Sequence, residues 1–589
     1  MICNFKPVLQ KLQKHSAESV ESAHSSTDYS EYLHVDRPIQ NDVLDLLARE
    51  QILPRKSLVL LCGSAGDGKS HMLSHFSAQH KELMDGFDKI INDATESDAP
   101  SRTACQTLAT ELEPFDDFHL DNGQNDKFIV AINEGMLSQF LSSKEGSSFS
   151  TLAAYVEETG ILKTALSNRG YEHESIFHAV SFSDYRPFTL INGESRTQFL
   201  DELFSKVFSM DDSNPFFAAR RKYCEGCSSK KLCPVCHNYD FLSLPEIQRT
   251  VADAIVEVSL AEHYIVTTRS TLNFLYDLIV SPNFDRGSIN LSVNKNIALA
   301  RYIPQTTPYL MYERKWGDSL GSRISRLDVM RMESEGIDEL AILLRTSSET
   351  VSKLLNVVND TPYYECLCDL IKPDALYNTG GEGDLKRVLL RFFVRCAHLS
   401  CRLEEICPDL VPSPYLKDYV SLLYSYNTDE SSSMKPLHKY LRKAIENWNG
   451  DYPSGYSRVA SYGNVQILQE LDTGFRKPDA VGFEKGSELT KFSPNLIAHA
   501  YLRNTGSDAV TFVVNYSLYC LLRRMNEGYQ PTILEKNLFT DFATSYERLV
   551  GLGAKSREVF IAQRDLGKRP RYKIFYDEDF EEYGMEVVD

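Results

Sequence analysis

The stretch SLVLLCGSAGDGKSHML, residues 57–73, determines the expected fold. Its first six residues, Ser57 to Cys62, form an apolar run of strand length, which is typical of a strand buried on both faces. A glycine-rich loop follows, and the segment from Ser70 to His80 has a helical pattern. We therefore expect a buried strand, a tight loop and a helix in direct succession.

The loop matches the pattern G-x-x-x-x-G-K-[ST] at every required position. Its residues are Gly63, Ser64, Ala65, Gly66, Asp67, Gly68, Lys69 and Ser70. Glycines permit backbone conformations that aim several N–H groups at one anion, and the positive end of the following helix faces the same point. Lys69 offers a positive charge to the β- and γ-phosphates, and the Ser70 hydroxyl is a ligand for Mg²⁺. The loop therefore predicts binding of ATP with Mg²⁺, against the alternative of a chance glycine loop.

Further apolar runs indicate a sheet around this strand. Strand candidates are Phe87–Ile91, Lys127–Asn133 and Ile176–Phe182, and helical stretches separate them. Strands that alternate with helices indicate a doubly wound, parallel α/β sheet. The expected fold class is therefore α/β, a P-loop NTPase with an inserted zinc knuckle and a mainly helical C-terminal half.

An acidic residue after a buried strand is what a P-loop ATPase places beside its metal. After the Lys127–Asn133 strand, Asn133 takes the position of the usual Asp, and Glu134 is placed to act as the base that activates water. Because Asn133 carries no charge, slow hydrolysis is an expected consequence. Asp93 and Asp98 are the fallback acids, and an ordinary buried strand with a turn is the alternative interpretation.

Two other polar positions are candidates for sensing the nucleotide. Asp184 follows the Ile176–Phe182 strand, and ligands of doubly wound sheets bind at the carboxyl ends of strands. Arg269, in Val266–Ser270, begins an apolar helix from which it would reach phosphates as part of a helical lid. A capped surface turn and a solvated arginine are the respective alternatives.

Four of the 13 cysteines lie close together, at Cys224, Cys227, Cys233 and Cys236. Two CxxC pairs suit a tetrahedral, structural Zn²⁺ site. An iron–sulfur cluster is the alternative metal centre, and four unrelated buried cysteines without a metal are the other alternative. Basic residues flank the cluster and form one local patch that would suit DNA phosphates or an acidic partner: Arg220, Arg221, Lys222, Lys230 and Lys231. A second patch consists of Lys568, Arg569, Arg571 and Lys573.

Length and composition limit the remaining possibilities. The chain has 589 residues and a net charge of −19, which argues against nucleic-acid binding over its whole surface. Neither a bilayer-spanning run nor a signal peptide is evident, so we expect a cytoplasmic protein without a membrane contact. The expected domains are a lead-in (1–55), an ATPase domain (56–300, with the knuckle at about 215–245 and the lid at about 246–300), a helical domain (301–430) and a mixed domain (431–589).

Several of these segments together resemble one known family. The loop CGSAGDGKSHML (62–73), the strand ending AINEG (131–135), the CxxC pair and VTTRS (266–270) resemble the DptF family, the ATPase-like component of DNA phosphorothioation-dependent restriction systems. The resemblance covers the first half of the chain. It implies a bacterial defence role against DNA that lacks phosphorothioate, with DptG and DptH as partners and with cleavage supplied by a partner subunit.

The sequence therefore predicts an ATP-hydrolysing subunit of a DNA restriction complex that contacts DNA through the complex or a local basic patch. Two alternatives stay open: a nucleotide-bound platform with little turnover, and an ATP-dependent chaperone or regulator unrelated to DNA. Assembly into a homo-oligomer would supply an arginine finger, which no residue of the sequence identifies.

Overall fold

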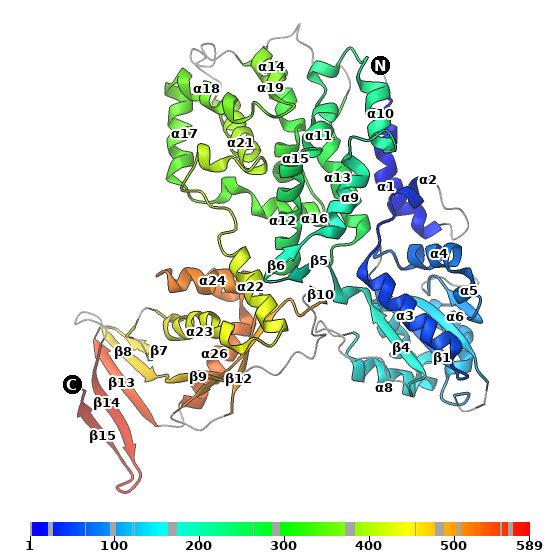
Figure 1. Cartoon of the computed structure of the whole chain (residues 1–589). Coiled ribbons are helices and arrows are strands. Elements are labelled where there is room, and N and C mark those ends of the chain that lie inside the picture. Colours follow the sequence, from blue (N-terminus) through cyan, green and yellow to red (C-terminus); the bar gives the residue numbers. More distant parts are fainter. Residues whose placement is uncertain are drawn as a thin grey trace. The chain divides into compact units, whose positions relative to one another are not determined.

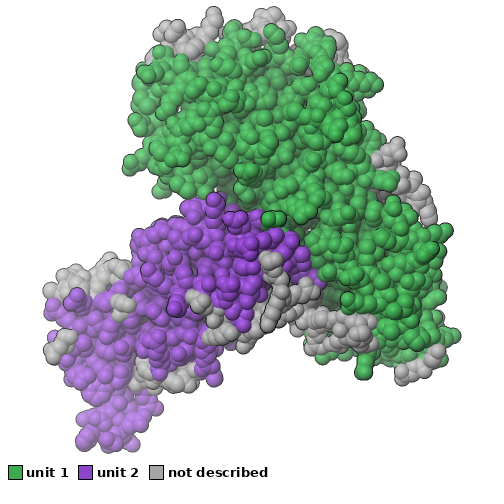
Figure 2. Space-filling view, viewed as in Figure 1, with its two compact units in different colours: residues 1–189, 196–259, 263–412 green, residues 190–195, 260–262, 413–589 purple. Residues whose placement is uncertain are grey.

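The computed structural model is a mixed α/β protein that divides into two compact units (Figures 1 and 2). Unit 1 comprises residues 1–189, 196–259 and 263–412, and unit 2 comprises residues 190–195, 260–262 and 413–589. The structure describes residues 3–21, 28–64, 66–94, 102–120, 122, 124–162, 174–262, 264–285, 295–371, 383–450, 452–453, 455–476, 488–503, 508–553, 557–563 and 569–588. Ala65, Asp98 and Lys568, which the sequence singled out, lie outside these residues.

A four-stranded, all-parallel sheet forms the first part of unit 1. Its order is β2-β3-β1-β4, and its strands are β1 (Ser57–Gly63), β2 (Lys89–Ile91), β3 (Lys127–Asn133) and β4 (Phe177–Ser181). All four coincide with the apolar runs predicted above. In the central pair the register joins Ser57 to Lys127 and Gly63 to Asn133, so these two strands end side by side.

Alternate residues of the central strands enter two separate apolar clusters, one on each face of the sheet. Val59 and Leu61 pack with α3 (Pro38–Ile52) and α4 (Lys69–Gln79). Leu58 and Leu60 pack with α6 (Ala104–Glu111), α7 (Glu134–Leu141) and α8 (Ser150–Thr159). Helices therefore cover both faces of the sheet, which explains why these strands are continuously apolar (Figure 1).

Unit 1 continues as a helical body with one large apolar core. The helices of this stretch are α9 (Gln198–Phe208), α10 (Pro215–Cys224), α11 (Pro234–Leu242), α12 (Pro245–Ala261), α13 (Thr268–Ile279), α14 (Lys295–Tyr302), α15 (Thr307–Glu313), α16 (Leu320–Ile324), α17 (Glu335–Thr346), α18 (Ser348–Val357), α19 (Tyr364–Leu370) and α21 (Gly383–Leu399). Ser347 separates two consecutive helices, because it ends α17 and caps α18. Phe5, Leu9 and Leu12 of α1 (Lys6–Glu21) belong to this helical core, so the first helix is a structural part of the body.

Unit 2 combines helices with antiparallel sheets. Its two main sheets have the orders β15-β14-β13-β8-β7 and β12-β11-β9, and strand β10 (Glu488–Lys491) also belongs to this unit. The strands are β7 (Tyr456–Tyr462), β8 (Val465–Glu470), β9 (Thr473–Arg476), β11 (Leu496–Leu502), β12 (Val510–Val514), β13 (Glu558–Gln563), β14 (Pro570–Asp577) and β15 (Glu582–Val587). The helices include α22 (Leu416–Asn427), α23 (Lys435–Asn447), α24 (Tyr516–Asn526), α25 (Ile533–Leu538) and α26 (Thr540–Gly553). Helices therefore dominate only as far as Asn447, and strands return in the last part of the chain.

In the parts of the chain that the structure describes, no helix combines the length and the apolar character that crossing a membrane requires.

Candidate functional site

The glycine-rich loop (residues 63–70) connects the carboxyl end of β1 to the first turn of α4. Gly66 and Gly68 have φ values of +88° and +92°, a left-handed backbone that side chains disfavour. Gly63 is closely surrounded, since a β-carbon there would lie 2.6 Å from Asp67 Oδ2 and 2.8 Å from Phe182 Cβ. The glycines predicted from the sequence are therefore required by the backbone conformation and by a close approach.

Within the loop, polar groups bind one another. The N–H of Ser64 donates to Asp67 Oδ2 at 2.5 Å, and the Lys69 ammonium donates to the Ser64 carbonyl oxygen at 2.7 Å. Both side chains are buried. Burial raises the pKa of Asp67 and lowers the pKa of Lys69, and the two opposite charges partly offset both effects. An anion that entered the loop would therefore compete with a carbonyl oxygen for Lys69 and with a carboxylate for the Ser64 N–H.

Two arginines from distant segments also reach the loop. Arg37, which precedes α3, donates from Nη1 to the Asp67 carbonyl oxygen at 3.1 Å. Arg269 lies in the first turn of α13, where the side chain of Thr267 caps the helix by accepting from Ser270 N at 3.0 Å. A β-carbon built at Gly66 would stand 3.1 Å from Arg269 Cδ. The loop is therefore bordered by three basic side chains, which suits a multiply charged anion.

Residues at the carboxyl ends of β2 and β3 also approach the start of α4. The Ser70 hydroxyl donates to the carbonyl oxygen of Asn92 at 2.8 Å, and Asp93 follows directly at the carboxyl end of β2. The charges of Asp93 and Glu134 both act on the pKa of Lys69, after burial and the stronger effects of Asp67 and Cys62. Asp93 and Glu134 are therefore near enough to Lys69 for their charges to act on it, and Ser70 joins α4 to the end of β2.

The two residues at the end of β3 make different contacts. Asn133 Oδ1 accepts a hydrogen bond from Met136 N at 2.6 Å, which makes Asn133 the N-cap of α7. The Glu134 carboxylate accepts a hydrogen bond from the Ser183 hydroxyl. Asp184 belongs to the short helical turn Phe182–Asp184 and, like Glu134, contributes to the raised pKa of the buried Cys62, for which burial is the main cause.

The sequence reasoning thus named residues that the fold brings together: Lys69, Ser70, Asn133, Glu134, Asp184 and Arg269. It did not name Arg37, and it ranked Asp93 below Asn133. The sequence feature that could have identified Arg37 is its position directly before Pro38, the first residue of a helix that packs on the central strand. The feature that could have favoured Asp93 is the short apolar run that precedes it.

The cysteine cluster lies in the helical body, at the end of α10 and the start of α11. A hydrogen bond between the thiols of Cys224 and Cys236 raises the pKa of Cys224 and lowers that of Cys236. Burial raises the pKa of Cys233 to about 12. Among the described residues, however, the cysteine sulfurs do not form a group of three or more donors within 4.8 Å of one another, whereas His34, Asp36 and His75 do.

The first basic patch is partly neutralised by acidic neighbours. Arg220 makes a two-pronged ion pair with Asp240, at 2.8 Å from Nε and 2.5 Å from Nη2. Arg221 donates to Asp212 at 2.5 Å. Lys222, Lys230 and Lys231 are exposed, as is Arg221.

Comparisons of the chain with protein-family models, with curated proteins and with solved structures found no match.

Proposed function

We propose that this protein is a P-loop ATPase that binds ATP with Mg²⁺ at the glycine-rich loop and hydrolyses it. The observation that carries the proposal is the position of Lys69 and Ser70. They begin a helix at the carboxyl end of the central strand of a parallel sheet, and basic side chains from two distant segments border the same loop. Ligands of open α/β sheets bind at this edge.

In this proposal the basic residues bind the phosphates. Lys69 exchanges the Ser64 carbonyl oxygen for phosphate oxygens, which carry more negative charge and form stronger hydrogen bonds. Arg269 contributes a guanidinium from α13, next to Gly66. Arg37 holds the Asp67 carbonyl oxygen and thereby keeps the middle of the loop in place.

For Mg²⁺ we assign Ser70 as a direct ligand and Asp93 as the carboxylate that orients the ion's waters. The 2.8 Å hydrogen bond from Ser70 Oγ to the carbonyl oxygen of Asn92 supports this pairing, because it joins the start of α4 to the residue before Asp93. The Asn133 amide oxygen is already occupied as the cap of α7. We therefore assign Asn133 a structural role in place of the metal-binding role that the sequence suggested.

For hydrolysis we assign Glu134 as the base that orients and deprotonates the attacking water. Its carboxylate stands at the end of β3 next to β1, and the hydrogen bond from Ser183 fixes its orientation. Asp184 lies in the same turn as Ser183 and is assigned to sensing the nucleotide state through that turn.

The wider role rests on the resemblance to the DptF family. We propose an ATPase subunit of a cytoplasmic DNA restriction complex, with DptG and DptH as partners and cleavage by a partner. We also propose a structural Zn²⁺ on the four clustered cysteines, which would require their sulfurs to move closer together than they are in this structure. Because Arg220 and Arg221 already pair with Asp240 and Asp212, DNA contact through the first basic patch would fall mainly to Lys222, Lys230 and Lys231.

A nucleotide-bound platform with little turnover is the second candidate. The buried Asp67 favours it, because its carboxylate occupies the Ser64 N–H inside the loop and adds negative charge where phosphates would bind. Tight binding without phosphate release would select this candidate.

The test is calorimetric titration with Mg·ATP, combined with steady-state phosphate release with and without DNA. Lys69→Ala should abolish binding, Glu134→Gln should retain binding and lose release, and Lys81→Ala, an exposed lysine beyond the same helix, should match the wild type. Folded protein that shows no affinity for Mg·ATP would contradict the proposal. Release that DNA does not stimulate would favour the chaperone or regulator alternative.

A further inference from the structure

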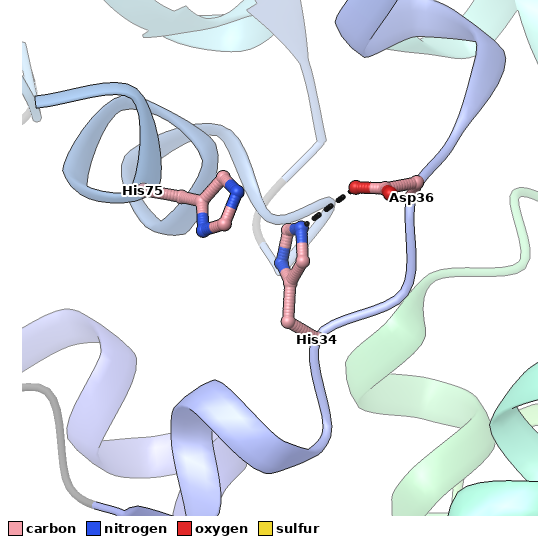
Figure 3. Close-up of side chains that lie close together, drawn as sticks. All are labelled: His34, Asp36 and His75. Atoms are coloured by element: carbon pink, nitrogen blue, oxygen red, sulfur yellow. Dashed lines mark hydrogen bonds and ion pairs between the residues drawn. The ribbon is translucent and has the colours of Figure 1, made fainter. Parts of the chain in front are cut away.

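A cluster of histidines lies between the segment that precedes α3 and the helix α4, and the proposed nucleotide site does not include it. His34 and Asp36 lie in the short segment before α3, and His75 lies on α4 (Figure 3). One donor atom from each residue lies within 4.8 Å of the others.

A fourth residue completes the cluster. His71 and His75 are four residues apart on α4, so they lie on one face of the helix, the spacing with which helical histidines hold zinc in metalloproteases. His71 Nε2 is 3.0 Å from His34 Nδ1, and the rings of His34 and His75 are stacked with centroids 4.0 Å apart. Both nitrogens of His34 thus face polar partners.

Both ring nitrogens of His34 have polar neighbours. Nδ1 faces His71, and Nε2 lies 3.3 Å from Gln40 Nε2 and 3.2 Å from Asp36 Oδ1. The Arg37 N–H donates to Gln40 Oε1 at 3.4 Å, which holds the Gln40 amide in place beside His34.

The contact between His34 and Asp36 places two metal-ligand types side by side. His34 Nε2 lies 3.2 Å from Asp36 Oδ1, within hydrogen-bonding distance (Figure 3). An ion that replaced the proton between them would turn both into ligands. The contact of Nδ1 with His71 is then the outer hydrogen bond that metal-binding histidines usually make.

We propose that His34, Asp36 and His75 bind a divalent ion of the zinc class. Two imidazoles and one carboxylate are ligands that Zn²⁺ prefers, and three protein ligands leave a position for water. His71 is a positioning residue. The side chain of Lys206, which after burial and the nearby His75 also lowers the pKa of His34, weakens cation binding, and the Asp36 charge offsets it.

The site would connect α4 to the segment that carries Arg37. Arg37 follows Asp36 directly and donates to the Asp67 carbonyl oxygen of the loop, so a bound ion would fix the position of that guanidinium. This coupling rests on the proposed nucleotide function, whereas metal binding does not. Zinc binding is therefore measured without nucleotide, and its failure would be distinct from a failure to bind ATP.

The test uses the full chain as purified, titrated with Zn²⁺ by calorimetry, with X-ray absorption on the bound ion. Beyond any zinc held by cysteines, we expect one further equivalent in the wild type and in His80→Ala, which removes a histidine just beyond the same helix. His75→Ala and His34→Gln should lose this equivalent, and His71→Ala should bind it about 10- to 100-fold more weakly. The added ion should show N/O ligands at about 2.0–2.2 Å and lack the sulfur distance of about 2.3 Å.

Equal zinc uptake by His75→Ala, His34→Gln and the wild type would overturn the proposal. An added equivalent with an all-sulfur shell would overturn it as well, because that zinc would belong to the cysteines. Because the two histidines lie on different segments, a folding defect in one variant leaves the other to decide.

Discussion

Arg269 lies against Gly66: its Cδ atom is 3.1 Å from the position that a β-carbon would take at that glycine. The helical body thereby places a guanidinium on the loop that extends from the sheet. Arg269→Ala should weaken Mg·ATP binding by about 10- to 100-fold, since hydrogen bonds to charged groups contribute about 1.5–3 kcal/mol. Calorimetry measures this, with the exposed Arg345→Ala as the control. An unchanged affinity would remove Arg269 from the site.

Asp93 and Asn133 should respond differently to substitution. Asp93→Ala should abolish the dependence of ATP binding on Mg²⁺, because it removes the proposed metal carboxylate. Asn133→Ala should keep that dependence and lower the free energy of unfolding by about 1 kcal/mol, the usual effect of losing an N-cap. Binding measured with and without Mg²⁺, together with urea unfolding, separates the two. The opposite result would restore Asn133 as the metal-binding residue.

Asp328 forms the most enclosed ion pair of the described helical body. It accepts from Arg395 Nε at 3.0 Å, and the two side chains are 5% and 1% exposed. Asp328→Ala should lower the free energy of unfolding by about 3–5 kcal/mol, because it leaves a buried charge with a single remaining acid, Glu313. Asp318→Ala, which removes an exposed partner of Arg323, should change it by less than about 1 kcal/mol. If urea unfolding gave similar losses of stability for Asp328→Ala and Asp318→Ala, burial of the ion pair would not determine its contribution.

His398 should make the protein less stable in mild acid. Burial lowers its pKa from 6.5 to about 4, so the unfolded chain takes up a proton before the folded chain does. Stability is therefore lost as the pH falls from about 6.5 to about 4, by about 2 kcal/mol after allowance for partial solvent access. Urea unfolding at about pH 7 and about pH 4.5 should show a smaller difference in His398→Gln than in the wild type or in His80→Gln. An equal difference in all three would exclude His398 as the cause.

Removal of zinc should destabilise the segment 215–245. Structural zinc sites contribute apparent binding free energies of about 10–16 kcal/mol, and a chelator would withdraw that contribution from α10 and α11. Hydrogen exchange should then rise in this segment and stay constant in the β1–α4 segment. Unchanged exchange after verified loss of metal would reject a structural zinc.

The sequence predicted the sheet better than it predicted the contacts around the loop. A strand such as Leu58–Leu61 is covered on both faces and must be apolar throughout, so its pattern is unambiguous. Arg37 and Arg269 are different, because their contacts depend on tertiary packing between segments far apart in the chain. The order β2-β3-β1-β4 likewise depends on long-range pairing. Farther along the chain, strand β12 and helix α24 are separated by Asn515 alone, so an apolar pattern does not show where the strand ends and the helix begins.

The order of the parallel sheet has a consequence for synthesis of the protein. The central strand β1 pairs with β3 and β4, which end at Asn133 and Ser181. All residues up to Ser181 must therefore leave the ribosome before β1, β3 and β4 can pair and form the sheet edge at which Lys69 lies. Until then β1 lacks its partner strand β4 on one edge, so nascent or truncated chains that stop earlier should depend on chaperones and be prone to aggregate.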